Sequence, residues 1–342
     1  MNARGGQYPP YEMFLVDAHL DLAYNALRGR QVLLPARQQT ADNEGIPSVG
    51  LPDLRDGHVG LICATIFCAP DSPNDAGYKS AEEAHAMASQ QIDWYRRQFD
   101  DGQLLAVRTR ADLPSGPEAA SISAIILLEG ADPIRTPEDV AWFVEAGVRI
   151  VGLAWRQTRY AGGTGAPGPL TAEGIRLVKE LDRFRIIHDA SHLAEASFWQ
   201  LLDLSPGKLI ASHSNCRAIV PTDRQLSDAM IRAIAGRDGV IGINFYDRFL
   251  IAPGEYGKQR ATLDDVVTHV RHICDVIGDD RHVGIGTDMD GGLGREQIPV
   301  EIETSADLPR LADALGARGL NDTAVRNILG DNWRSFFAQA LP

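Results

Sequence analysis

Short apolar runs alternate with amphipathic stretches along the whole chain, and this alternation is the feature that most constrains the fold. Eight of the runs are rich in Ile, Val and Leu with little internal alternation, which is typical of strands covered on both faces. They span residues 14–18, 59–67, 122–128, 149–154, 185–189, 208–212, 240–245 and 282–286. The repeated order of strand, helix and strand predicts parallel strands joined by right-handed crossovers.

Eight such units predict an α/β fold, a (β/α)8 barrel of the TIM type, although a doubly wound open sheet shows the same alternation. The intervening helical patterns cover residues 80–99, 137–146, 171–184, 193–204, 228–235 and 262–277. Two extra C-terminal helices, over residues 322–329 and 331–340, are expected to pack outside the barrel. No low-complexity linker or internal repeat divides the chain, so we expect a single domain over residues 1–342.

The balance of charge argues against two classes of partner. The chain has 33 basic and 46 acidic residues, a net charge of −13, and such a surface repels nucleic-acid phosphates and anionic lipids. No stretch approaches the roughly 18 apolar residues of a membrane span. The N-terminus lacks the basic start and apolar core of a secretory signal. We therefore expect a cytoplasmic protein that binds neither nucleic acid nor membranes.

Side chains that bind metals follow the carboxyl ends of five predicted strands. In a barrel of parallel strands these ends meet at one face, where catalytic groups from distant parts of the sequence converge. One histidine at a strand end is usually a satisfied polar residue, but five such ends indicate a shared site. The segments are Asp17-Ala18-His19-Leu20-Asp21, Glu129, His188-Asp189-Ala190-Ser191-His192, Ser212-His213-Ser214 and Thr287-Asp288-Met289-Asp290.

Five of these residues have the spacing and chemistry of metal ligands. His19 and Asp21 are two apart on a strand, so their side chains share a face, about 7 Å apart along it. Glu129 ends an apolar run, where a buried carboxylate needs a partner such as a metal or an arginine. His192 and His213 are 21 residues apart with one helix between them, which suits adjacent strands. Imidazole and carboxylate ligands without cysteine favour zinc and, less selectively, manganese, cobalt or iron.

Asp288 follows a Gly-containing run, residues 283–286, and is a candidate for moving a proton. Asp290, two residues on, either supports Asp288 or caps the next turn. The pattern around them lacks the twelfth-position acid of a calcium loop, so we exclude calcium there. His188 lies inside an apolar run and is expected to pack, and we expect structural roles for the histidines at positions 58, 85, 269, 272 and 282.

Six motifs follow one another along nearly the whole chain. They are Asp17-Ala18-His19-Leu20-Asp21, Leu128-Glu129-Gly130, Asp189-Ala190-Ser191-His192, Ser212-His213-Ser214-Asn215, Asn244-Phe245-Tyr246 and Val283-Gly284-Ile285-Gly286-Thr287-Asp288-Met289-Asp290-Gly291. In this order they resemble the membrane dipeptidase (renal dipeptidase) family of the amidohydrolase superfamily. The resemblance implies a metallo-dipeptidase, a hydrolase with two zinc ions per chain, and makes a homodimer a fair expectation.

The resemblance divides the ligands between two ions. It implies that His19 and Asp21 bind one zinc, that His192 and His213 bind the other, and that Glu129 bridges them. A hydroxide held between the ions then attacks the amide carbonyl. The expected substrate is a dipeptide, including one with a C-terminal D-residue, or a related N-acyl amino acid.

The resemblance also assigns roles beside the metals. Arg224, eleven residues after His213, matches the arginine that grips the substrate's terminal carboxylate, a role that suits a bidentate ion pair. Asp288 matches the acid that takes the proton and returns it to the leaving nitrogen, and with Glu129 it completes the predicted catalytic residues. Tyr246, in its motif, is expected to bind substrate.

One stretch, Trp155 and the following residues 156–160, departs from the family pattern. The family usually has a histidine six residues beyond the arginine of Gly147-Val148-Arg149, thought to contact the substrate carbonyl, and this chain has Trp155. We expect Trp155 to contact substrate in a pocket of different shape and charge. The alternative hypothesis is therefore a related enzyme acting on another small amide, lactam, ester or N-acyl amino acid. A third hypothesis is a metal-binding homologue without catalysis, against which the retention of Asp288 and Arg224 argues.

Overall fold

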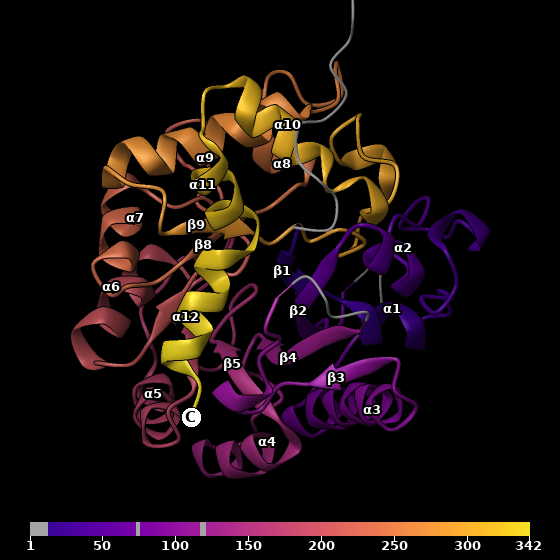
Figure 1. Ribbon diagram of the computed structural model, residues 1–342. Coiled ribbons are helices and arrows are strands. Elements are labelled where there is room, and N and C mark those ends of the chain that lie inside the picture. The colour runs from indigo at the N-terminus through magenta and orange to yellow at the C-terminus, as the bar shows by residue number, and fades with distance from the viewer. Residues whose placement is uncertain (1–12, 73–75, 117–120) are drawn as a thin grey trace, which may run out of the picture.

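The computed structural model describes residues 13–72, 76–116 and 121–342, and a parallel sheet lies at its centre (Figure 1). The strands of this described part pair only in parallel. They are β1 (Leu15–Leu20), β2 (Val59–Phe67), β3 (Leu104–Ala106), β4 (Ile122–Glu129), β5 (Val148–Gly152), β6 (Ile187–Asp189), β7 (Leu209–Ile210), β8 (Ile241–Ile243) and β9 (Val283–Ile285).

Eight of the strands form a nearly closed barrel, which confirms the predicted (β/α)8 fold. Neighbours follow the order β7-β6-β5-β4-β2-β1-β9-β8, and a bridge between Ala211 and Ile241 connects the two ends of this path. All eight strands of the ring coincide with predicted runs, within a few residues at each end. The sequence analysis missed β3, which pairs with β4 outside the ring, because three residues are too few to show a pattern of burial.

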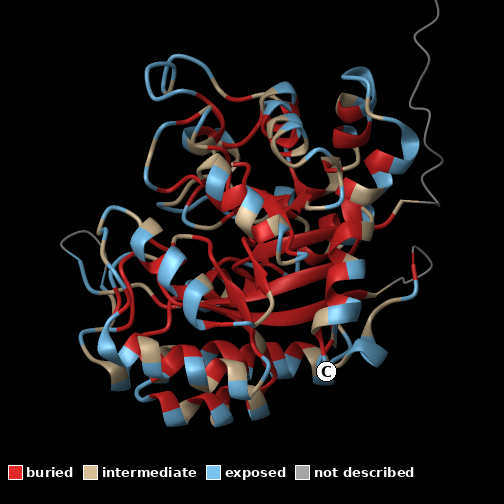
Figure 2. Cartoon of the chain, turned by 90° about the vertical axis from the view of Figure 1, so that its left-hand side faces the viewer, coloured by how far each residue is buried: buried red, intermediate tan, exposed pale blue. Residues whose placement is uncertain are grey.

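Helices cover the outside of the barrel, and their exposed sides face away from the almost wholly buried strands (Figure 2). Ser80 and Thr262 begin two of the long helices, as predicted, because each side chain accepts a backbone hydrogen bond from the first turn. No helix of the described residues is long and apolar enough to cross a membrane. The helices up to residue 317 are α1 (Leu22–Leu27), α2 (Leu51–Asp56), α3 (Ala81–Asp100), α4 (Val140–Ala146), α5 (Ala172–Arg183), α6 (Glu195–Leu204), α7 (Asp228–Ala235), α8 (Asp247–Leu250), α9 (Leu263–Ile277) and α10 (Arg310–Ala317).

The last helices close one end of the barrel and form the yellow segment that runs from α11 down through α12 to the C-terminus in Figure 1. A π-helical turn over Asn327–Asp331 joins α11 (Asp322–Arg326) to α12 (Asn332–Ala340), so the two predicted helices form one continuous segment. Trp333 of α12 is fully buried in a cluster with Phe14 and Val240, which immediately precede β1 and β8. Since α12 covers the amino ends of the strands, the carboxyl ends remain for the site.

Candidate active site

The five predicted metal ligands lie together at the carboxyl ends of the barrel strands. His19 belongs to β1 and Asp21 follows it directly, while Glu129 is the last residue of β4. His192 and His213 each come three residues after a strand, β6 and β7 respectively. Four of the five are buried, and the side chain of His192 is only 9% exposed. The fold thus brings together residues that are up to 194 positions apart in the sequence.

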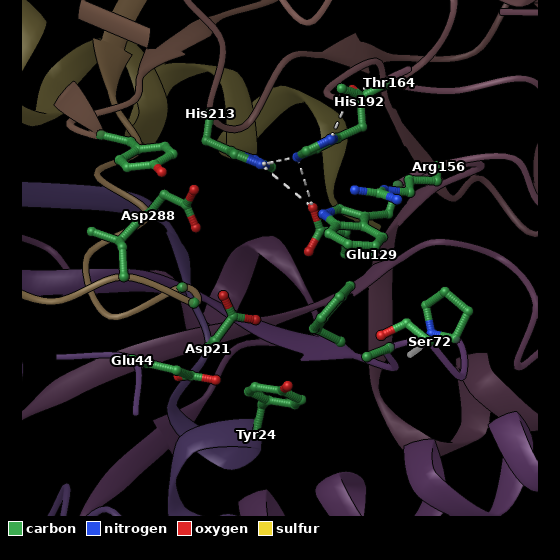
Figure 3. A pocket seen from close by; sticks show the side chains of 18 of the residues that line it. Asp21, Tyr24, Glu44, Ser72, Glu129, Arg156, Thr164, His192, His213 and Asp288 are labelled. Atoms are coloured by element: carbon green, nitrogen blue, oxygen red, sulfur yellow. Dashed lines mark hydrogen bonds and ion pairs between the residues drawn. The ribbon is translucent and has the colours of Figure 1, made fainter. Parts of the chain in front are cut away.

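Glu129 stands between two groups of these ligands (Figure 3). Its Oε1 lies 3.3 Å from His192 Nε2 and 3.4 Å from His213 Nε2. Its Oε2 lies 3.6 Å from His19 Nε2, which is itself 3.7 Å from Asp21 Oδ2. One carboxylate oxygen therefore faces each group, which is the arrangement of a bridging ligand.

Buried polar atoms without partners show that this cluster fits a bound cation. Among the described residues, His19 Nε2, Asp21 Oδ1 and Glu129 Oε1 have no hydrogen-bond partner. The Nε2 atoms of His192 and His213 are only 3.0 Å apart. Burying such atoms unpaired is costly, and a cation between them removes the cost. Imidazole nitrogens with carboxylate oxygens are a ligand set of zinc.

Ser212 sets the tautomer of two of the histidines. Its hydroxyl donates to Asp189 Oδ2 at 2.5 Å, and its oxygen lies 2.7 Å from His213 Nδ1 and 3.3 Å from His19 Nδ1. A hydroxyl has one donor and two acceptor positions, so both Nδ1 atoms carry the hydrogens that Ser212 accepts. Both rings then direct Nε2 toward Glu129, and Nε2 is the atom that each ring offers to a metal.

The ring of His192, the third histidine of the cluster, is held by the loop that contains Thr164. The backbone is also strained at two residues of the site. Thr164 Oγ1 lies 3.0 Å from His192 Nδ1 (Figure 3). His192 has a φ of +64° and Asp288 a φ of +60°, both in the left-handed region. Such a conformation costs a non-glycine residue on the order of 1–3 kcal/mol and is concentrated at functional sites.

Burial and neighbouring charges set the ionisation of the three histidines. Burial, followed by repulsion from cationic neighbours, holds the pKa of His192 and of His213 well below the usual value. These rings are therefore neutral, which is the form that binds metals. Burial also opposes a charge on His19, but the carboxylates of Glu129 and Asp21 outweigh it and raise the pKa of His19 well above the usual value. The cluster thus stabilises positive charge at His19.

Asp288, the predicted proton-transfer acid, lies beside these ligands. Its Oδ1 is 4.0 Å from His19 Nε2, and Asn244 Nδ2 donates to its Oδ2 at 2.9 Å. Burial is the main reason that the pKa of Asp288 rises to about 8, and repulsion from Asp21 adds to the effect. Gly291 leaves room for this carboxylate, because a Cβ there would lie 2.0 Å from Asp288 Oδ1.

Asp290 supports the site from behind and does not line the cavity. It accepts hydrogen bonds from the backbone N–H groups of Ser48 and Val49, at 2.9 and 3.0 Å, and pairs with Arg30 at 3.2 Å. Arg30 Nη2 lies 4.0 Å from Glu44, a residue of the cavity wall. The carboxylate of Asp290 therefore fixes the segment of Ser48 and Val49 behind the cavity wall, rather than the side chain of Asp288.

A cavity of about 560 Å³ opens over the cluster (Figure 3). This volume lies within the range of about 300–1,000 Å³ that is usual for small-molecule sites. Trp155 and Tyr246, the two aromatic residues expected to contact substrate, are in its wall. The Trp155 ring lies 5.1 Å from the ring of Phe67 and 6.3 Å from that of His192. Four of the predicted ligands and the proton-transfer acid also line it: Asp21, Glu129, His192, His213 and Asp288.

Arg224 lies behind this wall. It is 4% exposed, and its guanidinium donates to Ser214 Oγ at 3.0 Å and to the carbonyl oxygen of His213. Its guanidinium carbon is 5.2 Å from the centroid of the Phe249 ring. Burial lowers the pKa of Arg224 to about 10. Its Nε has no hydrogen-bond partner among the described residues, so the Nε–H is unused.

The sequence analysis missed the cavity residues that come from loops and from helix α1. Hydrophobic periodicity carries no information about such positions, since loop side chains are oriented by tertiary contacts. Arg156 had a signal, because it adjoins Trp155 in the stretch that departs from the family pattern. Thr164 also had a signal, because the Gly/Pro-rich segment over residues 161–169 is typical of an active-site loop. The missed residues include Tyr24, Glu44 and Arg156.

The fold is a parallel (β/α)8 barrel, and buried histidines and carboxylates lie at the carboxyl ends of its strands, beneath a small-molecule cavity. Together these features define a metal-dependent hydrolase.

Comparison with known proteins specifies this class. The profile of the family described as membrane dipeptidase (peptidase family M19) matches residues 11–340, and the chain belongs to this family. An uncharacterized dipeptidase of Schizosaccharomyces pombe is 31% identical over 296 residues, which are 82% of this chain and 70% of that protein. These findings confirm the predicted family and the class of peptide-bond hydrolase.

Two solved structures share the fold over nearly their whole length. One is described as the dipeptidase AC, a metallopeptidase of family M19; it is 28% identical with a TM-score of 0.82, and covers 96% of this chain and 99% of its own. The other is a metallopeptidase of Rhodobacter sphaeroides with a phosphinate mimic of the dipeptide L-Ala-D-Ala. It is 27% identical with a TM-score of 0.82, over the same shares of the two chains.

Proposed function

We propose that the protein is a binuclear zinc dipeptidase that hydrolyses the amide bond of dipeptides, including those with a C-terminal D-residue. His19 and Asp21 would hold one ion, His192 and His213 the other, and Glu129 would bridge them. When bound, the two ions polarise the scissile carbonyl and lower the pKa of water. The observation that carries the proposal is the position of Glu129, with one oxygen facing each group of ligands.

Residues around the ligands would position the substrate and move the proton. Asp288, held by Asn244, would take a proton from the attacking water and return it to the leaving nitrogen. Arg224 would anchor the terminal carboxylate through its unused Nε–H and so orient the scissile bond. Tyr246 and Trp155 would bound the space for the side chains. The dipeptide mimic in the Rhodobacter sphaeroides relative supports both a dipeptide and a D-residue as substrate.

A dipeptide library tests the proposal. The purified protein, with zinc restored, is incubated with L,L and L,D dipeptides, and the release of free amine is measured. We expect hydrolysis that a chelator abolishes and that Asp288→Ala abolishes while zinc is still bound, with elemental analysis giving two zinc ions per chain. The proposal fails if no dipeptide releases amine, or if release survives both treatments.

A second candidate function is hydrolysis of another small amide, a lactam or an N-acyl amino acid, and Trp155 is the observation that favours it. An indole offers one N–H and no titratable nitrogen where the family usually has an imidazole. If the substrate has changed, Trp155→His should raise the turnover of dipeptides. Unchanged turnover would count against this second candidate.

A further inference from the structure

Arg156 is the only arginine or lysine among the described residues that line the cavity. Its guanidinium forms no ion pair or side-chain hydrogen bond with the described part of the chain. A cation without a carboxylate partner, in a cavity whose wall is otherwise acidic, is available to a ligand. The carboxylates of the same wall are Asp21, Glu44, Asp71, Glu129 and Asp288.

Aromatic rings hold Arg156 in this position. Its guanidinium carbon lies 5.2 Å from the centroid of the Trp155 ring, within the range of a cation–π contact. Trp155 packs edge to face on Phe67 at 5.1 Å, and Phe67 packs on Tyr24 at 5.3 Å. In Figure 3 the guanidinium lies on the same side of the cavity as His192. Trp155, which stands where the family usually has a histidine, thus positions the guanidinium of Arg156 through a cation–π contact.

Two guanidinium groups then lie near the site, Arg156 in the cavity wall and Arg224 buried behind it. Under the proposed function, the buried Arg224 takes the terminal carboxylate of the dipeptide. A dipeptide with neutral side chains has no second carboxylate for Arg156. The planar guanidinium of Arg156 is suited to a carboxylate, which it can bind through two hydrogen bonds. Glu44 and Asp71 of the wall already pair with Arg28 and Lys79, at 3.7 and 3.6 Å, so they do not occupy Arg156. We propose that Arg156 is a specificity residue that binds an acidic side chain, and that the preferred substrates are dipeptides containing Asp or Glu.

This inference rests on the proposed dipeptidase function, and pairs of nearly isosteric substrates test it. The kcat/KM values of the zinc-loaded enzyme are compared for Ala-Glu with Ala-Gln and for Glu-Ala with Gln-Ala, in L,L and L,D forms. We expect at least a tenfold preference for glutamate at one position, equivalent to about 1.4 kcal/mol. The preference should shrink as sodium chloride is added, because exposed ion pairs are screened.

Variants separate Arg156 from a general effect of charge. Arg156→Gln should reduce the Glu/Gln ratio of kcat/KM to near one, and Arg156→Lys should retain part of it. Arg183 is the matched control, since it too lies over the ring of an adjacent residue, Phe184, at 4.7 Å, but it is on α5 and outside the cavity lining. Arg183→Gln should leave the ratio unchanged.

The outcomes distinguish this inference from the function on which it rests. Equal kcat/KM for glutamate and glutamine peptides, or a preference that survives Arg156→Gln, overturns the role of Arg156 and leaves the dipeptidase function intact. If no dipeptide is hydrolysed, the proposed function fails. Calorimetric binding of the same peptides then decides on Arg156, because a Glu/Gln affinity ratio that Arg156→Gln abolishes supports it and an equal affinity overturns it.

Discussion

Replacing Ser212 with alanine would test how the barrel orients its metal ligands. The hydroxyl accepts from the Nδ1 atoms of His213 and His19 and donates to Asp189. Without this hydroxyl, both rings lose the partner that sets their tautomer. The buried Oδ2 of Asp189 also loses the hydrogen bond that it accepts from Ser212. The backbone N–H of residue 212 still donates to Asp189 Oδ1 at 2.9 Å, so we expect the strand end to stay in place.

The magnitude follows from the number of rings that this hydroxyl serves. Loss of one outer partner of a metal-bound histidine weakens metal binding about 10- to 100-fold, which corresponds to about 1.4–2.7 kcal/mol. Ser212 contacts one histidine of each proposed pair, His213 of one and His19 of the other. We therefore expect Ser212→Ala to weaken both zinc sites by about 10- to 100-fold each.

Competition for zinc with a chromophoric chelator at fixed pH measures this effect without relying on turnover. Ser197 provides the matched control, because it is a fully buried serine whose hydroxyl donates to the Gly168 carbonyl at 2.8 Å, away from the ligands. Urea unfolding of the metal-free variants checks that both remain folded. Unchanged zinc affinity in Ser212→Ala, or an equal loss in Ser197→Ala, would refute the reasoning.

Four further predictions concern stability and the site. Trp333→Ala should lower the free energy of unfolding by about 3–5 kcal/mol, because it leaves a cavity where the buried indole closes the barrel. A loss below about 1 kcal/mol in urea unfolding would contradict this. Burial raises the pKa of Asp247 to about 6, so the folded state loses stability as pH rises from about 4 to 6. Asp247→Asn should therefore add up to about 3 kcal/mol at pH 8 and nothing at pH 3, and a gain that is the same at both values would contradict the assignment. Gly291→Ala should displace the carboxylate of Asp288, crowd that of Asp21, 3.0 Å from the added Cβ, and so lower kcat; a normal kcat would show that both carboxylates have room to move. Removing metal with EDTA should lower the melting temperature, and zinc should restore it, because a cation pairs the buried atoms of the cluster; equal melting temperatures with and without zinc would contradict this.

Much of the barrel could be predicted because its strands are buried on both faces. A run such as 122–128 is apolar at every position but Ser123, and this composition is visible without any knowledge of its neighbours. β3 is different, since it has only three residues, of which Leu104 is buried and Leu105 is exposed, and it pairs at one edge only. The turn that joins α11 to α12 was also hidden, because a π-helical turn continues a helix where the pattern indicated a break.

The candidate ligands could be named for a related reason. A charged or imidazole side chain directly after a buried strand is unusual, and in a parallel barrel all such positions meet at one face. Asp288 was found in the same way. Ser212 and Asp189 were present in the motifs, but their mutual hydrogen bond depends on the distance between two strand ends, which periodicity does not report.

The sequence by itself determined the class of fold, the face on which the site lies and the residues that gather there, because these follow from the solvation of each segment. The tertiary structure alone decided which arginine reaches the cavity. Arg224 and Arg156 both come from loops, and packing turns the first under Phe249 and stacks the second on Trp155. The direction of a loop side chain is set by contacts with distant segments, and no local pattern encodes it.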